Sequence, residues 1–228
     1  MDAAKADLMR DLGRLARGLS ALFWGLPLTL MVNVETARTD RLDFLGAAAF
    51  APAVILNAVL WHGLHQMRGF QRQERIWQQA LRRAEIFAII NIGMAPFLFW
   101  WHRFPSVAFY VACVDLLAAS GLLFLIHLNQ VLHRLSAMLP DEMLRAETKT
   151  YTACNIWMLL AVLAGLCLYI AFGPLQMPDI VWGNFHLRPQ ERSLWLALFL
   201  TLMPVAMTMA LLWKIKEAIF TGLFTVER

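Results

Sequence analysis

The chain alternates long apolar stretches with shorter basic or polar ones, and this alternation predicts membrane-spanning helices. The clearest stretch is 107–128, VAFYVACVDLLAASGLLFLIHL, which has the length needed to cross the hydrocarbon core of a bilayer as a helix. Five further stretches share its character. The six predicted spans are residues 18–34, 44–65, 86–101, 107–128, 155–173 and 194–213. We therefore expect an all-α, polytopic integral membrane protein whose single membrane domain fills residues 1–228.

The segments outside the spans also read as helical. Residues 1–17 place leucines at helical spacing among Lys, Arg and Asp, which predicts an amphipathic helix lying at the membrane surface. The two longest connections on the same side, 66–84 and 129–154, are rich in strong helix formers. We expect both to be long helical inner loops.

The distribution of basic residues predicts the orientation. With the N-terminus in the cytoplasm, the inner segments hold 15 of the 20 Lys and Arg residues and the outer loops hold 5. Basic residues concentrate on the cytoplasmic side of membrane proteins. An even number of spans returns the chain to the side on which it began, so both termini are expected to be cytoplasmic. The expected location is a bacterial inner membrane.

Composition supports this interpretation. The chain is 60% hydrophobic and only 16% charged, and a soluble domain of this size carries more charge. The net charge of +4 comes from the loops that set orientation. It therefore predicts no nucleic-acid partner; the expected partners are the lipid bilayer and either further copies of the chain or other membrane subunits.

Three neighbouring spans each carry one polar residue on a stripe of small residues. Asp115 lies on a stripe with Ala108, Ala112 and Ala119. Asn57 and Asn91 lie on similar stripes of Gly and Ala in the second and third spans. Small residues let helices approach closely and polar groups on that face point to neighbours. We expect these three side chains to face the interior at similar depth.

Asp115 is the only acid in the middle of a span, and no Lys or Arg lies inside any span to neutralise it. A charge there costs several kcal/mol on insertion scales, roughly 3 at the helix centre. Asp115 is therefore expected either to belong to an ion or proton site, or to be a protonated residue that locks helices or contacts a partner subunit. The sixth span adds Thr201 and Thr208 on one stripe, and these are included in the predicted path.

Prolines occur within four predicted spans, at positions 27, 52, 96 and 204. A proline inside a helix leaves a carbonyl one turn earlier without its usual donor. Such carbonyls can coordinate cations, which favours transport, although kinked helices are also common in membrane proteins of other kinds.

Four histidines lie at the predicted inner ends of the second and fourth spans: His62, His65, His127 and His133. Two histidines facing each other at one depth can ligate a b-type haem. Together with Glu85 or Glu147 they can form another metal site. The alternative is that these imidazoles simply sit at the interface between lipid and water.

Residues 20–32, SALFWGLPLTLMV, resemble in spacing the first helix of the small six-helix potassium channels of bacteria and lysosomes. The second span, like theirs, ends in Trp-His before a basic loop. Ala21 stands where that family has its signature Asp, and Leu19 where it has Phe. The resemblance implies channel activity, and the departures keep us from assigning the chain to the family.

The sequence thus favours a small oligomeric ion channel or secondary transporter with a polar site near Asp115. The alternatives are a non-catalytic membrane subunit of a larger complex and a haem-binding redox subunit. No nucleotide-binding loop and no zinc-protease motif occurs in the chain. A membrane enzyme of another type is the remaining alternative, so the sequence leaves open whether the protein is an enzyme.

Overall fold

The computed structural model describes residues 3–39, 44–46, 48–71, 73–139, 142–172 and 189–225. Across these residues the chain is helical and contains no strand. The helices are α1 (Ala3–Arg38), α2 (Ala51–Met67), α3 (Arg75–Met94), α4 (Pro96–Arg103), α5 (Ala108–Met138), α6 (Glu142–Phe172) and α7 (Pro189–Thr225).

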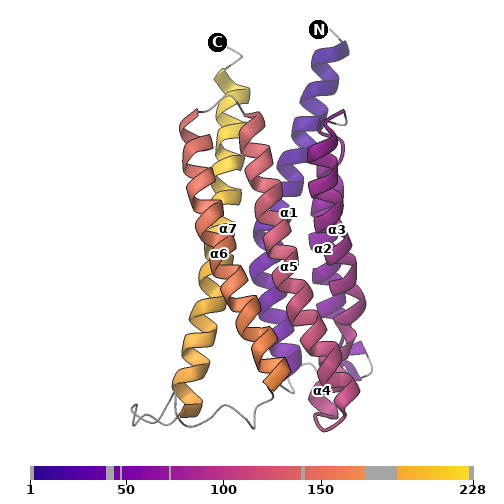
Figure 1. Cartoon of the computed structure of the whole chain (residues 1–228). Coiled ribbons are helices and arrows are strands. Elements are labelled where there is room, and N and C mark those ends of the chain that lie inside the picture. The colour runs from indigo at the N-terminus through magenta and orange to yellow at the C-terminus, as the bar shows by residue number, and fades with distance from the viewer. Residues whose placement is uncertain are drawn as a thin grey trace.

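The helices form one bundle of long rods that run side by side (Figure 1). α4 continues α3 beyond a turn at Ala95, so the two act as one rod. α1 packs on α2, α5 packs between α3 and α6, and α7 packs on α1 and α6. The N-terminal end of α1 and the C-terminal end of α7 lie at the same end of the bundle, as expected for an even number of crossings. We call this the termini end.

Four helical segments of the described chain are long and apolar enough to cross a membrane. They are Met9–Arg38, Arg75–Arg103, Ala108–Met138 and Arg145–Ala171. They correspond to the first, third, fourth and fifth predicted spans. α2, with 17 residues, and α7 are not among the four, so a total of six spans and the orientation of the termini stay predictions.

The predicted inner segments are extensions of the rods. The structure has one helix, α1, where a separate surface helix at 1–17 and a first span were expected. Leu15 and Leu19 are fully buried, because a leucine stripe that suits a membrane surface equally suits a neighbouring helix. Most of 66–84 and 129–154 is helical as expected, but it belongs to α3, α5 and α6.

α1 and α2 approach most closely at two glycines. A Cβ atom on Gly18 would lie 2.6 Å from the backbone oxygen of Gly63, and one on Gly63 would lie 3.1 Å from the oxygen of Gly18. Gly18 therefore has no room for a side chain, and a side chain at Gly63 would be a tight fit. The close approach packs the leucines of both helices into the core, among them Leu22 and Leu64.

Only two of the four prolines lie inside helices. Pro27 interrupts α1 and Pro204 interrupts α7. Pro52 occupies the first turn of α2, and Pro96 begins α4. At the start of a helix the missing N–H would have had no intrahelical partner, so Pro52 frees no carbonyl, contrary to expectation. Pro96 lies where α4 continues α3, so it has no N–H to donate to the Ile92 carbonyl one turn earlier, as expected.

Candidate functional site

A cavity of about 410 Å³ lies between the helices, in the half of the bundle away from the termini, and each of α1 to α7 contributes to its walls. This central cavity reaches along α1 as far as Arg38, the last residue of that helix, which ends opposite the termini (Figure 1). Most of its lining is Leu, Val, Ala and Phe. Its polar lining residues are Thr29, Asn33, Arg38, Asn57 and Asn91.

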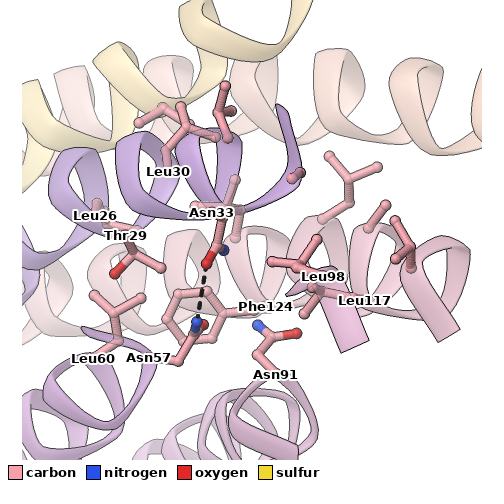
Figure 2. A pocket seen from close by; sticks show the side chains of 18 of the residues that line it. Leu26, Thr29, Leu30, Asn33, Asn57, Leu60, Asn91, Leu98, Leu117 and Phe124 are labelled. Carbon is pink, nitrogen blue, oxygen red and sulfur yellow. Dashed lines mark hydrogen bonds between the residues drawn. The ribbon is translucent and has the colours of Figure 1, made fainter. Parts of the chain in front are cut away.

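The stripes predicted for α2 and α3 place two asparagines on its wall. Ala53 and Ala88 are buried, and Asn57 and Asn91 are 3% and 5% exposed, so both stripes face the interior as predicted. Asn57 Nδ2 donates to the Ala53 carbonyl at 2.8 Å and to Asn33 Oδ1 at 3.5 Å. Figure 2 shows the Asn33, Asn57 and Asn91 side chains converging on one side of the cavity.

Asn91 forms a hydrogen bond with α5 on the side away from the cavity. The Ser120 hydroxyl lies 2.5 Å from Asn91 Oδ1 and donates to it, with the Leu117 carbonyl a second acceptor at 3.1 Å. Because Oδ1 is engaged, the amino group is the part of the amide left for the cavity. No described residue accepts a hydrogen bond from it.

The cavity therefore presents neutral hydrogen-bonding groups. Thr29 Oγ1 is buried without a hydrogen-bond partner among the described residues, although a helical threonine ordinarily donates to the carbonyl four residues earlier. An unsatisfied buried hydroxyl costs about 1–3 kcal/mol, which a ligand or water in the cavity would offset. Arg38 supplies the only charge among the described lining residues, and no carboxylate accompanies it there.

Asp115 does not line this cavity, although Val114, Leu117 and Ala118 beside it do. The carboxylate is half-buried and makes no hydrogen bond or ion pair with a described residue. Ala108 and Ala112 on its stripe are exposed. The expected grouping with Asn57 and Asn91 is therefore not found, because α5 packs through another face, on which Leu117, Ser120 and Phe124 are buried.

A second polar cluster joins α5, α6 and α7, and we call it the polar knot: Asn129, Asn155 and Thr208. All three side chains are fully buried. Asn155 Nδ2 donates to Asn129 Oδ1 at 3.0 Å, Thr208 Oγ1 at 3.0 Å and the Pro204 carbonyl at 3.2 Å. Asn129 Nδ2 also donates to Thr208 Oγ1, at 2.9 Å. Thr208, which was expected on the ion or solute path, thus links helices through hydrogen bonds. The side chain of Thr201, also expected on that path, lies outside the described residues.

The two histidines of α2 have local partners at the termini end. Gln66 Nε2 donates to His62 Nε2 at 2.7 Å. His65 stacks on Trp61, with 5.4 Å between ring centroids, and its Nδ1 lies 4.0 Å from the Glu85 carboxylate.

The two histidines of α5 are placed elsewhere. His127 stacks on an aromatic ring of α3, and His133 borders a small cavity between α3, α5 and α6. The cavity next to His65 is a different one, and neither contains a second histidine. Glu147 is ion-paired with Lys214. The described residues contain no group of three or more metal-ligating side chains, so the geometry gives no support to a haem or metal site.

Several site residues escape sequence reasoning. Asn129 lies one residue beyond the predicted span 107–128, in a predicted loop, and Asn155 is the first residue of the predicted span 155–173. Asn33 lies at the end of the first span, and Thr29 and Ser120 are residue types common in membrane helices. Only the helical spacing of Thr29 and Asn33, four residues apart on one face, could have indicated a shared cavity.

Comparison with known proteins adds nothing to the geometry. No family model, curated protein or solved structure matches the chain.

Proposed function

We propose that this protein is a small membrane transport protein whose central cavity binds a solute with an apolar body and a hydrogen-bonding head. The observation that carries the proposal is the convergence of Asn33, Asn57 and Asn91 from three helices on one cavity. Solute sites of this kind are mostly apolar with a few placed polar groups, and about 410 Å³ is within their usual range.

The chemistry of the lining favours a carrier over a cation channel. A cation inside the membrane needs carboxylates or many carbonyl oxygens around it. The polar lining offers amides and a hydroxyl, and its one charge is the Arg38 guanidinium. Amides both donate and accept, which suits a neutral or zwitterionic head such as that of an amino acid with an apolar side chain. Arg38 at the mouth would attract an anionic end.

Efflux from proteoliposomes tests the proposal. Vesicles are loaded with leucine, glycerol, urea and potassium, and release is compared with protein-free vesicles. We expect faster release of at least one neutral or zwitterionic solute, with about tenfold loss in Asn57→Leu, since buried polar contacts to a solute are typically worth 1–3 kcal/mol. Ile55→Leu, on the exposed face of the same helix, is the matched control. Potassium release without release of the other solutes, or no release at all, would contradict the proposal.

A second candidate is a non-catalytic subunit of a larger membrane complex, either with further copies of the chain or with other proteins. Asp115 on α5 favours it, because this half-buried carboxylate has no partner among the described residues and the small residues Ala108 and Ala112 on its stripe are exposed. The mass of the protein purified in mild detergent tests this. A single chain with efflux activity would dismiss the candidate, and a larger complex that loses stability on dissociation would support it.

We further propose, from the concentration of Lys and Arg on one side, that both termini are cytoplasmic. The cavity mouth would then face the outer side of a bacterial inner membrane.

A further inference from the structure

A second cavity, of about 220 Å³, lies between α3, α5 and α6 toward the termini end, separate from the central cavity. Its polar lining is Gln79, Arg83, Gln130, His133, Arg134 and Thr152. We call it the basic pocket. It differs from the central cavity in kind, because two guanidinium groups border it and no described lining residue is acidic.

The charges of the basic pocket are uncompensated within the described chain. Neither Arg83 nor Arg134 forms an ion pair with a described residue. The acids nearby are engaged elsewhere: Glu85 lies 3.1 Å from Arg68, and Glu147 pairs with Lys214. Two like charges on adjacent helices repel one another, and an anion between them would remove that repulsion.

The pocket also contains buried hydrogen-bonding atoms that have no partner. Thr152 is 4% exposed, and its hydroxyl makes no hydrogen bond with a described residue. Its helical neighbour Thr150, in contrast, donates to the Ala146 carbonyl. His133 Nδ1 is likewise buried and unpaired. Gln130 Oε1 already accepts from His127 Nδ1 at 3.1 Å, which leaves the Gln130 amide nitrogen as a further donor.

From this arrangement we propose that the basic pocket binds a phosphate group, held by Arg83 and Arg134 and by the Thr152 hydroxyl. Guanidinium groups bind phosphate oxygens through paired hydrogen bonds. The pocket lies where the rods leave their apolar segments, which is the depth of a lipid headgroup, and basic pockets between membrane helices bind anionic lipid heads. The phosphate can come from an anionic phospholipid or from the aqueous phase, and both sources present the same oxyanion.

Native mass spectrometry of the detergent-purified full chain tests the proposal, with phosphatidylglycerol as the probe and phosphatidylcholine as the neutral comparison. We expect tighter binding of phosphatidylglycerol. Each arginine contributes about fivefold in affinity near a membrane surface, so Arg83→Gln combined with Arg134→Gln should weaken it about 25-fold. Arg82, Arg83 and Arg134 are all exposed, but Arg82 does not line the pocket. Arg82→Gln should therefore change the affinity less than about twofold.

Two additions keep the test decisive. Thr152→Val removes the buried hydroxyl with little change of shape and should weaken phosphatidylglycerol binding about fivefold, which decides the matter if the double variant does not fold. Inorganic phosphate is then added as a competitor. Displacement of the lipid by inorganic phosphate means that the pocket accepts either source, and lack of displacement means that the acyl chains are required. Equal binding of the two lipids with no effect of inorganic phosphate on thermal stability would overturn the proposal, as would equal losses in Arg82→Gln and the double variant.

Discussion

The Ser120 hydroxyl on α5 lies 2.5 Å from the Asn91 carboxamide oxygen on α3, behind the side of Asn91 that lines the central cavity. This contact fixes which end of the Asn91 amide faces the cavity, since an amide whose oxygen is engaged presents its nitrogen as a donor. The proposed solute site thus depends on a residue that does not line it.

Ser120→Ala should therefore weaken solute release without removing a lining side chain. We expect about a three- to tenfold lower release rate in the proteoliposome assay, with a stability loss near 1 kcal/mol, because one buried hydrogen bond is lost. Ser136→Ala is the matched control. Ser136 is also a buried serine of α5 that donates to the carbonyl three residues earlier, His133 O. If both variants slow solute release equally, Ser120 contributes only to packing, and the proposed orientation of the Asn91 amide is not needed for release.

The polar knot should contribute measurably to stability. Asn155→Leu removes the amide nitrogen that donates to three acceptors, and it leaves Asn129 Oδ1 without its donor. Interhelical hydrogen bonds in membranes are worth about 0.6 kcal/mol on average and up to roughly 1.7, so we expect a loss of about 1–2 kcal/mol in the free energy of unfolding. The measurement is reversible denaturation in mixed detergent micelles. Thr150→Val, on the exposed side of α6, should change it little.

Gly18→Ala should disrupt the packing of α1 on α2. The added methyl would lie 2.6 Å from a backbone oxygen, which cannot move without shifting a helix, and overpacking of this kind costs about 1–3 kcal/mol. Gly13→Ala in the same helix meets nothing within 4 Å and should instead be neutral or stabilising by up to about 1 kcal/mol. Melting temperatures of the two variants that shift in the same direction would refute this account of the contact.

The ion pair of Arg68 and Glu85 should behave as a coupled unit. Glu85 is 5% exposed, and its Oε1 lies 3.1 Å from Arg68 Nε. Arg68→Gln leaves a buried carboxylate without its counter-charge, and because Arg68 itself is half exposed we expect a loss of about 1–2 kcal/mol. Adding Glu85→Gln should restore most of that stability. A double-mutant cycle measures the coupling, and strictly additive losses would show that the pair is not coupled.

The fold class follows from the sequence because long apolar runs leave the backbone few ways to satisfy its hydrogen bonds in lipid. The stripes of Asn57 and Asn91 could be predicted for a related reason: small residues and one amide on a single face leave the other faces to lipid. The stripe of Asp115 has the same pattern, but α5 has three neighbouring rods, formed by α3 with α4, by α6 and by α7, and the pattern does not say which face meets them. Its contacts are made through Leu117, Ser120 and Phe124.

The sequence does not predict where the helices end. The hydropathy of the sequence indicates where the chain leaves the lipid. A helix can continue beyond that point when neighbouring helices bury its residues. Asn129 therefore lies in the core of the bundle although it follows the last residue of its predicted span. The partners of each polar group, such as Asn33 for Asn57, depend on how rods rotate against one another, which periodicity within one helix does not encode.

The central claim is that Asn57 and Asn91 border one cavity that opens at the end of the bundle opposite the termini. Cysteine accessibility tests it most directly, in a background where Cys113, Cys154 and Cys167 are replaced by Ala. A membrane-impermeant methanethiosulfonate reagent is added outside sealed vesicles whose protein has its termini inside. Asn57→Cys and Asn91→Cys should react, and Ile89→Cys, 55% exposed on the outer face of α3, should not, because thiols in lipid do not ionise. Labelling of Ile89→Cys with no labelling of the two cavity positions would contradict the account.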